Sequence, residues 1–260
     1  MQASCEAFSL IELLVVIAII TILAALLLPV INNAKNQGAK AADLNNLHQI
    51  MMAVHVYTDD NKDIIPWSNW DYGAPMPDGT IRPGWLYTLN PATNGPAAFN
   101  PQGSLLWDSL HSGNGTKVLV CPMDQPALAS FSQHYNCVTN RPQQLSSYVM
   151  NGAVNGFQTG YLSNAIPVKA SQMLPTDCIL FEAYELEPFC FNDGANWPSE
   201  GLATRHSQGG DWGALDGSSS YISDDAWDNE LNDPNKNSLW CYPLTDDGGD
   251  AVYGHPIFND

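Results

Sequence analysis

Asp59, Asn61 and Asp63 place side-chain oxygens at alternate positions of the chain, as at the start of a calcium-binding loop. Calcium takes about six to eight hard oxygen ligands, so this alternation is chemically sensible. However, Ile64 stands where the sharp turn of such a loop needs glycine, and no glutamate follows at the closing position. We interpret these residues as a solvated acidic turn or a helix end, with calcium binding as the alternative.

His206 is followed, after nine intervening residues, by Asp216 and Gly217. Glycine supplies the positive φ angles that tight turns need. The segment 205–217 therefore predicts a strand, a turn at Gly209 and Gly210, a second strand, and a turn at Asp216 and Gly217. We expect His206 and Asp216 to hold this hairpin through side-chain to backbone hydrogen bonds. A binding site is the alternative interpretation.

Motifs of common enzymes are missing from the chain, which contains no GxSxG, HExxH or GxxxxGK[ST] sequence. A catalytic carboxylate pair could escape detection among 27 acidic residues. We predict that the protein is not an enzyme and has no catalytic residues.

Six cysteines, at positions 5, 121, 137, 178, 190 and 241, form no CxxC pair and no Cys/His spacing of a zinc site. Structural zinc is therefore not predicted from spacing. In an exported protein, Cys121 with Cys137 and Cys178 with Cys190 could close short loops as disulfides. Reduced, buried thiols are an equally good interpretation, because spacing does not reveal connectivity.

Residues 8–28 read FSLIELLVVIAIITILAALLL, and positions 13–28 contain no ionisable group. As a helix rising about 1.5 Å per residue, this segment would cross a hydrocarbon layer of about 30 Å. Glu12 is the exception, because a carboxylate in such a segment costs on the order of 3 kcal/mol and calls for a cation. Alternatively, Glu12 lies near the membrane interface, where it can be solvated or protonated.

The stretch AFSLIELLVVIAIITILAALLLP resembles the processing and methylation site of type IV prepilins and type II secretion pseudopilins. The resemblance implies cleavage by a prepilin peptidase between Ala7 and Phe8, followed by methylation of the new Phe8 amine. Glu12 then matches the family's glutamate, which meets the N-terminal amine of a neighbouring subunit during assembly. The implied partners are the peptidase, other pilin or pseudopilin subunits, an inner-membrane assembly platform and the lipid bilayer.

The spacing from His206 to Asp216 also resembles the H-X9-DG domain attached to prepilin-type stems. That domain has two further short sequence motifs, which we call islands. They are matched by CysProMetAsp at 121–124 and TyrValMetAsn at 148–151. With the stem, the resemblance covers most of the chain.

The leader MQASCEA lacks the Lys or Arg usual in this family, whereas Lys35 and Lys40 follow the apolar segment. Charge counting alone would place the head inside the cell. The motif implies the opposite orientation, a single-pass inner-membrane protein with a periplasmic head that later joins a periplasmic or extracellular filament.

Pro29 predicts a kink or local unwinding after the membrane segment, beyond which the helix resumes. The resumed helix carries a stripe whose members are small at first and bulky later, which suits helix packing and then a domain core. The stripe consists of Ala34, Gly38, Ala41, Leu44, Leu47, Met51 and Val54.

Beyond Pro66 the chain becomes rich in Gly, Pro, Asn, Ser and aromatic residues, which indicates short strands and long irregular loops. We predict an α+β fold in which a long N-terminal helix packs on a small antiparallel sheet. The predicted strands are 117–121, 147–150, 178–182 and 212–215. The predicted parts are a leader (1–7), a transmembrane helix (8–28), an amphipathic stem (29–60) and an extracytoplasmic head (61–260).

The formal net charge of −18 would repel phosphate backbones, so nucleic acid is excluded as a partner of the head. The leading hypothesis is a structural subunit of a type IV pilus-like filament or a type II secretion pseudopilus. The alternatives are a membrane-tethered extracellular binding module and a polymer-acting hydrolase.

Overall fold

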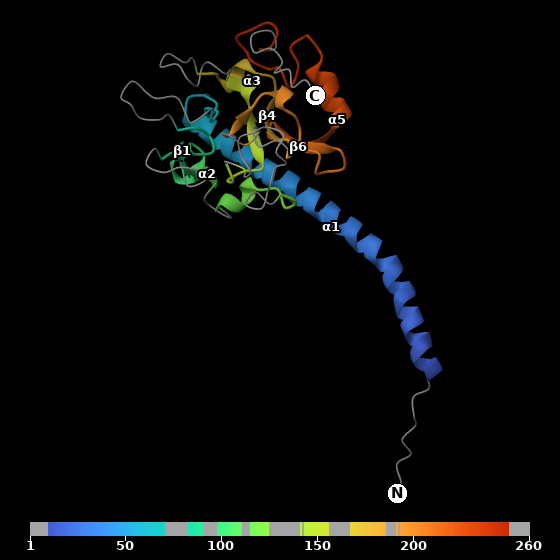
Figure 1. The fold of residues 1–260 in the computed structure, drawn as a ribbon. Helices are drawn as coiled ribbons and strands as arrows, with labels where there is room; N and C mark the ends of the chain where they lie inside the picture. The colour runs from blue at the N-terminus through green and yellow to red at the C-terminus, as the bar shows by residue number, and fades with distance from the viewer. Residues whose placement is uncertain are drawn as a thin grey trace. The chain divides into compact units, whose positions relative to one another are not determined.

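The computed structural model describes most of the chain beyond its first nine residues (Figure 1). The described residues are 10–70, 83–90, 98–110, 115–124, 141, 143–155, 167–185, 191 and 193–249. They fall into two compact units, residues 1–41 and residues 42–260. The second unit thus includes the last part of the predicted stem, with a boundary some twenty residues earlier than the one the sequence suggests.

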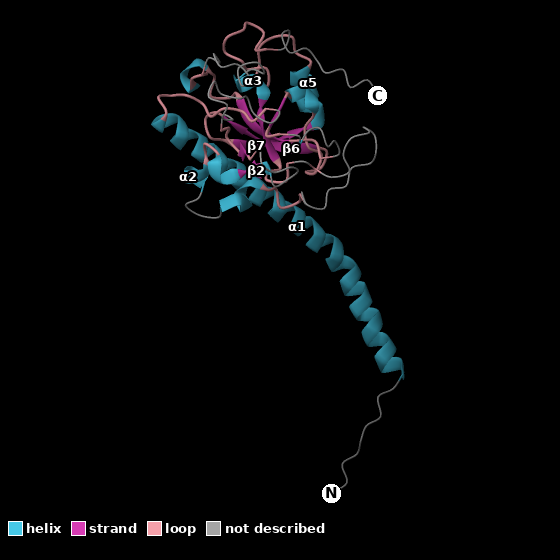
Figure 2. Ribbon diagram, turned by 60° about the vertical axis from the view of Figure 1, so that its left-hand side comes forward, coloured by secondary structure: helices cyan, strands magenta, loops and turns pink. Residues whose placement is uncertain are grey.

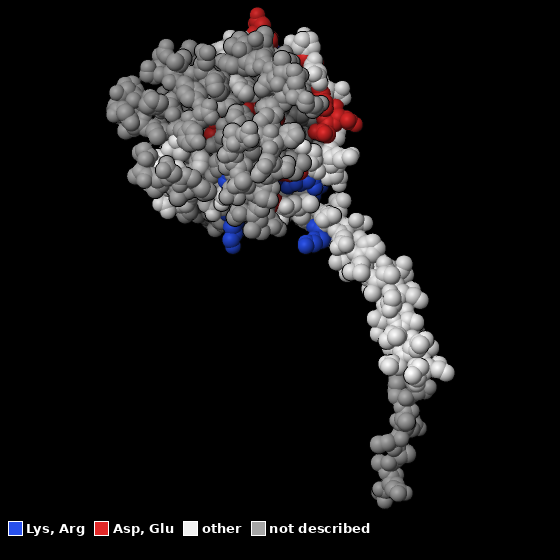
Figure 3. Space-filling model, in the orientation of Figure 1, with Lys and Arg blue, Asp and Glu red and all other residues white. Residues whose placement is uncertain are grey.

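Helix α1 runs from Leu10 to Asp60 and is the only described helix that is long and apolar enough to cross a membrane. Its most apolar stretch has no buried residue, and Figure 3 shows an uncharged face along it. The hydroxyl of Thr21 donates to the carbonyl of Ile17 at 2.7 Å, which satisfies this polar group inside the helix itself.

Pro29 lies inside α1 without ending it. The sequence predicts a kink or local unwinding at this residue, but the helix continues through it as one element. Proline removes a single backbone donor, and the turns on either side remain helical. The expected unwinding is therefore wrong.

The second unit contains a five-stranded sheet with the order β5-β3-β4-β6-β7 (Figure 2). Three neighbouring pairs are antiparallel, whereas β3 and β5 are parallel, so the predicted antiparallel sheet is a mixed one. The strands are β3 (Tyr148–Asn151), β4 (Cys178–Glu182), β5 (Ala195–Asn196), β6 (Gly209–Ala214) and β7 (Ser219–Ser223).

Shorter elements surround this sheet. Strands β1 (Thr88–Leu89) and β2 (Phe99–Asn100) form a separate antiparallel pair. The helices are α2 (Trp107–Leu110), α3 (Gly152–Asn155) and α5 (Asp224–Leu231), with 3-10 turns η2 (Pro101–Gly103), η3 (Gly115–Leu119), η4 (Ala170–Gln172) and η6 (Pro198–Glu200). Most of the head is thus irregular loop, as its Gly, Pro and Asn content predicts.

The central strands β3 and β4 are buried along their whole length, because the sheet is covered on both faces. On one face, Leu47, Ile50 and Met51 of α1 join a core cluster with Tyr148 and Leu180. On the other face, a second cluster contains residues of β3, β4, the 191–202 loops, β7 and α5, including Val149, Phe181 and Trp227. The stem positions Leu47, Met51 and Val54 therefore pack in the core, as the stripe predicts.

A register shift in β4 adapts this strand to its neighbours. Cys178 pairs with Ala214 and Leu180 pairs with Gly213, so Ile179 is an extra residue in the ladder. As a result, Ile179 and Leu180 belong to the same core cluster although they are adjacent in the strand.

The predicted strands 147–150, 178–182 and 212–215 correspond to β3, β4 and the second half of β6. The strand predicted at 117–121 is wrong, because η3 occupies most of it. The turn predicted at Gly209 and Gly210 is also wrong, because both glycines lie in β6. The preceding turn lies at 205–208, where Ser207 and Gln208 each have a φ of 63°.

Three of the cysteines lie within the described part, and all three are buried free thiols: Cys121, Cys178 and Cys241. Cys137 and Cys190, the disulfide partners considered above, lie outside the described residues. Reduced, buried thiols are thus observed wherever the structure describes a cysteine.

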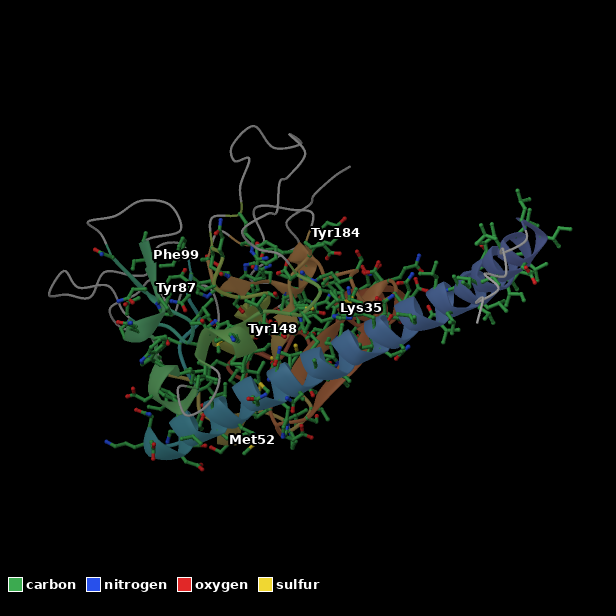
Figure 4. All side chains as sticks on the ribbon, turned by 90° about the horizontal axis from the view of Figure 1, so that it is seen from below. Lys35, Met52, Tyr87, Phe99, Tyr148 and Tyr184 are labelled. Carbon is green, nitrogen blue, oxygen red and sulfur yellow. The ribbon has the colours of Figure 1, made fainter. Side chains whose placement is uncertain are left out.

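Ile50→Ala tests whether α1 is part of the head core. Ile50 is fully buried, so the truncation should destabilise the head by about 2–5 kcal/mol through lost burial and a cavity. Met52 lies two residues away on the opposite face of α1 and is 49% exposed (Figure 4). Met52→Ala should change the unfolding free energy by less than about 0.5 kcal/mol in urea titrations followed by tryptophan fluorescence. Equal effects of both variants would contradict the packing described here.

Asp177→Asn tests the pH dependence of stability. Burial of Asp177 raises its pKa to about 6, although the backbone hydrogen bond from Leu174 and the charge of Lys236 act in the opposite direction. The raised pKa means that the protonated carboxyl favours the folded state, so stability falls as pH rises from about 4 through 6. The amide keeps an acceptor for Leu174 but cannot ionise.

At pH 7 the unfolding free energy of the variant should therefore exceed that of the wild type by on the order of 1–2 kcal/mol. The variant should accordingly unfold at a higher temperature. At pH 4 the difference should shrink toward zero. Thermal scans by circular dichroism at the two pH values measure this, and a pH-independent difference would contradict it.

Candidate functional site

A cluster of four ionisable or metal-ligating side chains is buried in the head. It consists of Asp43 in α1, Cys121 after η3, Glu182 at the end of β4, and His206 in the turn before β6. One nitrogen, sulfur or oxygen atom from each residue lies within 4.8 Å of the same atoms from the others. Four separate segments therefore converge on one point in the interior.

Asp43 and Cys121 are held by hydrogen bonds from neighbouring elements. Asp43 Oδ1 accepts a hydrogen bond from the hydroxyl of Tyr148 at 2.6 Å, which links α1 to β3. The backbone N–H of Cys121 donates to Ser147 Oγ at 2.9 Å, and Cys121 Sγ accepts from the N–H of Met123 at 3.4 Å. Both side chains are thus fixed before any ligand is considered.

Glu182 and His206 are positioned by the sheet. Glu182 Oε2 accepts from the backbone N–H of Asp211 in β6 at 3.0 Å. The backbone N–H of His206 donates to the carbonyl of Gly209 at 3.2 Å, which closes the tight turn before β6. This turn aims the imidazole at the side chains of α1 and β4.

Three acceptor atoms surround the Nε2 atom of His206. It lies 3.3 Å from Glu182 Oε2, 3.4 Å from Cys121 Sγ and 3.5 Å from Asp43 Oδ2. Burial lowers the pKa of this imidazole, but the contacts with Asp43 and Glu182 more than reverse that effect and raise it to about 10. The electrostatic potential at Nε2 is therefore strongly negative and favours a positive charge there.

Two arginines continue the charge pattern beside the cluster. Asp124 pairs with Arg141 at 2.6 Å and with Arg205 at 3.4 Å, and Arg205 Nε also lies 3.3 Å from Glu182. Burial alone would raise the pKa of Asp124, but Arg205 and Arg141, together with the Ser147 hydroxyl, lower it below its usual value. Asp124 is therefore an ionised carboxylate inside the head.

Cys121 does not have the surroundings of a reactive thiol. Burial raises its pKa far above the usual value, and the negative charges of Glu182 and Asp43 raise it further. A nucleophilic cysteine needs an accessible, electropositive environment that stabilises the thiolate. The arrangement is instead suited to holding a proton or a metal cation among its acceptor atoms.

The residues predicted as a hairpin site separate in the structure. His206 belongs to the buried cluster, and its side chain contacts acidic and thiol groups instead of the hairpin backbone. The exposed Asp216 and the buried Gly217 lie in the turn between β6 and β7, where Asp216 Oδ1 accepts from the N–H of Ser218 at 2.8 Å. Gly217 has a φ of 87°, and its carbonyl meets His48 Nδ1 at 2.8 Å.

The predicted calcium residues lie at the end of α1. Asp63 Oδ2 accepts hydrogen bonds from the backbone N–H and the hydroxyl of Ser171, and the amide of Asn61 donates to the carbonyl of Tyr57. Asp59 is exposed in the last turn of the helix. Calcium binding by Asp59, Asn61 and Asp63 stays a prediction.

Sequence reasoning missed Asp43 and Glu182 as site residues. Asp43 precedes Leu47 by four positions and therefore lies on the apolar face of the stem. An acidic residue on an apolar face indicates a buried polar site, and the sequence alone contains this indication. Glu182 ends a fully buried strand, where an ionised group needs partners. Cys121, Asp124 and Tyr148 belong to the two islands quoted above, and with His206 they meet at the cluster.

Glu12 lies in the first turn of α1, on the membrane segment. Ala7 and Phe8 lie outside the described residues. A carboxylate near a helix N-terminus is favoured by the helix dipole. Residues 3–28 match the family model of the prokaryotic N-terminal methylation motif. No curated protein and no solved structure matches the chain.

The match places a prepilin-type N-terminal motif on a helix that is long and apolar enough to cross a membrane. It covers the membrane part of the chain and does not extend to the head. The buried cluster therefore lies in a part of the protein to which the motif assigns no role.

Arg141→Met tests the ionic part of the cluster. Loss of this buried guanidinium should destabilise the head by about 3–5 kcal/mol, because Asp124 would lose its closest counter-charge. Lys117→Met is the matched control at an exposed position and should be nearly neutral. Urea unfolding of the full chain in detergent measures both, and a neutral Arg141→Met would show that the pair contributes nothing.

Proposed function

We propose that this protein is a structural subunit of a type IV pilus-like filament or a type II secretion pseudopilus. In this proposal a prepilin peptidase cuts between Ala7 and Phe8, the Phe8 amine is methylated, and the subunit assembles through α1. The observation that carries the proposal is the methylation motif at residues 3–28. It coincides with the apolar segment 8–28, in which Glu12 is the only carboxylate.

The apolar surface of α1 supports assembly through this helix. From Leu10 to Ile31 its large side chains are exposed within the chain, so they need lipid before assembly and other subunits after it. Further along, Ala34 and Gly38 are exposed, and no atom lies within 4 Å of a side chain added at Gly38. Small residues allow helices to approach closely, so this part of the stem suits packing between copies.

Glu12 gives the assembly its specificity in this proposal. A carboxylate in lipid is costly unless a cation meets it. The methylated amine of Phe8 in a neighbouring subunit supplies that cation, and pairing the two fixes the register of adjacent helices. Membrane insertion precedes this step, with the head in the periplasm and the assembly platform in the inner membrane.

The head in this proposal is of the H-X9-DG type. Support comes from the three quoted islands, whose residues Cys121, Tyr148 and His206 meet Asp43 in one buried cluster. No catalytic step is required of the head, and its role in the filament is structural.

Glu12→Ala tests the assembly step. The variant should insert into the membrane and carry N-methylated Phe8, but it should be absent from sheared filaments, because the amine of its neighbour finds no carboxylate. Thr21→Ala is the matched control in the same helix and should assemble normally, since its hydroxyl bonds only the Ile17 carbonyl. Membrane fractionation, mass spectrometry of the N-terminus and immunoblots of sheared material measure the three steps.

Normal assembly of Glu12→Ala would contradict the role of the carboxylate. An intact Met1 on the wild-type protein, in cells with an active prepilin peptidase, would contradict the proposal as a whole.

A further inference from the structure

We propose that Asp43, Cys121, Glu182 and His206 form a buried, four-coordinate site for a zinc-class divalent cation. The site lies in the core of the head and joins α1, the η3 segment, β4 and the turn before β6. It is independent of the filament role, because it uses none of the residues of the methylation motif.

The distances around His206 support coordination more than hydrogen bonding. In a tetrahedral zinc site with bonds of about 2.0–2.3 Å, neighbouring ligand atoms lie about 3.3–3.8 Å apart. The three distances from Nε2 are 3.3 Å to Glu182, 3.4 Å to Cys121 and 3.5 Å to Asp43. Charge-assisted hydrogen bonds from nitrogen to a carboxylate are shorter, about 2.7–2.9 Å. A single Nε2 hydrogen also cannot serve three acceptors well.

The carboxylate of Asp43 provides a second observation. Asp43 is fully buried, and its Oδ2 faces Nε2 of His206 at 3.5 Å, with the carboxyl of Asp211 beside it and no well-formed hydrogen bond from any described residue. A buried carboxylate oxygen without a donor is costly. A cation placed among the four ligand atoms would satisfy this oxygen directly.

The donor set selects the class of metal. One imidazole nitrogen, one thiolate sulfur and two carboxylate oxygens suit zinc and related first-row ions. Calcium and magnesium prefer oxygen ligands throughout and a higher coordination number. The site is therefore distinct from the calcium prediction at the end of α1.

The outer contacts are also those of a metal site. Tyr148 donates to Asp43, the N–H of Met123 donates to Cys121, and Asp211 N–H donates to Glu182. Such second contacts fix the orientation of metal ligands. Asp43 is held at Oδ1 and leaves Oδ2 facing His206, whereas Cys121 and Glu182 accept their outer hydrogen bonds at the same Sγ and Oε2 atoms that face His206.

The charges of the ligands suit a divalent ion. With both carboxylates ionised and Cys121 bound as thiolate, Asp43, Cys121 and Glu182 carry three negative charges. Arg205, whose Nε lies 3.3 Å from Glu182, offsets part of the remaining negative charge. On binding, the cation would displace two protons to solvent, the thiol proton of Cys121 and one proton of the His206 imidazolium, so that it binds a thiolate and a neutral imidazole. No oxidation or reduction is involved.

The test uses the full chain purified in detergent with reduced cysteines. Chelator-treated protein is reconstituted with Zn²⁺, dialysed and analysed by elemental mass spectrometry, with an expected content of about one ion per chain. Reconstitution with Co²⁺ should give the visible bands of tetrahedral cobalt and a near-ultraviolet thiolate-to-cobalt band. Competing Ca²⁺ should displace neither ion.

Variants separate coordination from folding. Cys121→Ser should lose the thiolate-to-cobalt band, whereas Cys241→Ser, a control at an equally buried free thiol, should keep it. Tyr148→Phe keeps all four ligands and should weaken metal affinity by about 10–100-fold. Circular dichroism checks that each variant is folded.

Two results would overturn the proposal. The first is a folded wild-type chain that retains no zinc after reconstitution, which would leave a metal-free ion network with a protonated His206. The second is a Cys121→Ser variant with the same metal content and cobalt spectrum as the wild type. Neither result bears on Phe8 methylation or on filament incorporation.

Discussion

The buried carboxylate of Asp43 is the constraint around which the head is arranged. It lies on the apolar face of α1, between solvent-exposed turns and the core positions that begin at Leu47. A buried charge in this place needs partners, and two of them come from other segments. Tyr148 reaches it from β3 and His206 from the turn before β6. These two contacts fix the position of the helix relative to particular strands. Apolar packing alone would fix that position less specifically.

Charges of alternating sign extend this arrangement across the interior. His206 lies between Asp43 and Glu182, Arg205 between Glu182 and Asp124, and Asp124 meets Arg141. Members of this network come from parts of the chain separated by many residues. A buried network of this kind favours the arrangement of the loops in which its opposite charges meet. This compensates for the small amount of regular structure in the head.

Sequence patterns reveal the elements with strong local signals. The apolar run predicts the membrane helix, and the apolar segment 178–182 predicts β4, because burial on both faces leaves a continuous hydrophobic run. The short segment 117–121 has no pattern that separates a strand from a 3-10 turn, and its prediction as a strand is wrong. The cluster was not predictable from spacing, since its four members stand far apart in sequence and only the tertiary fold unites them. Of the two members that the sequence analysis missed, Asp43 carried a local signal, as an acid on an apolar stripe.

The edges of the main sheet limit how copies of the head can meet. One edge, β5, is only two residues long, and the other, β7, has the sequence SSYIS and leads directly into α5. Short or polar edges discourage strand addition between molecules, and the net charge of −18 makes copies repel one another at low ionic strength. Both edges of the sheet, as far as the described residues show them, therefore disfavour strand pairing between copies of the head.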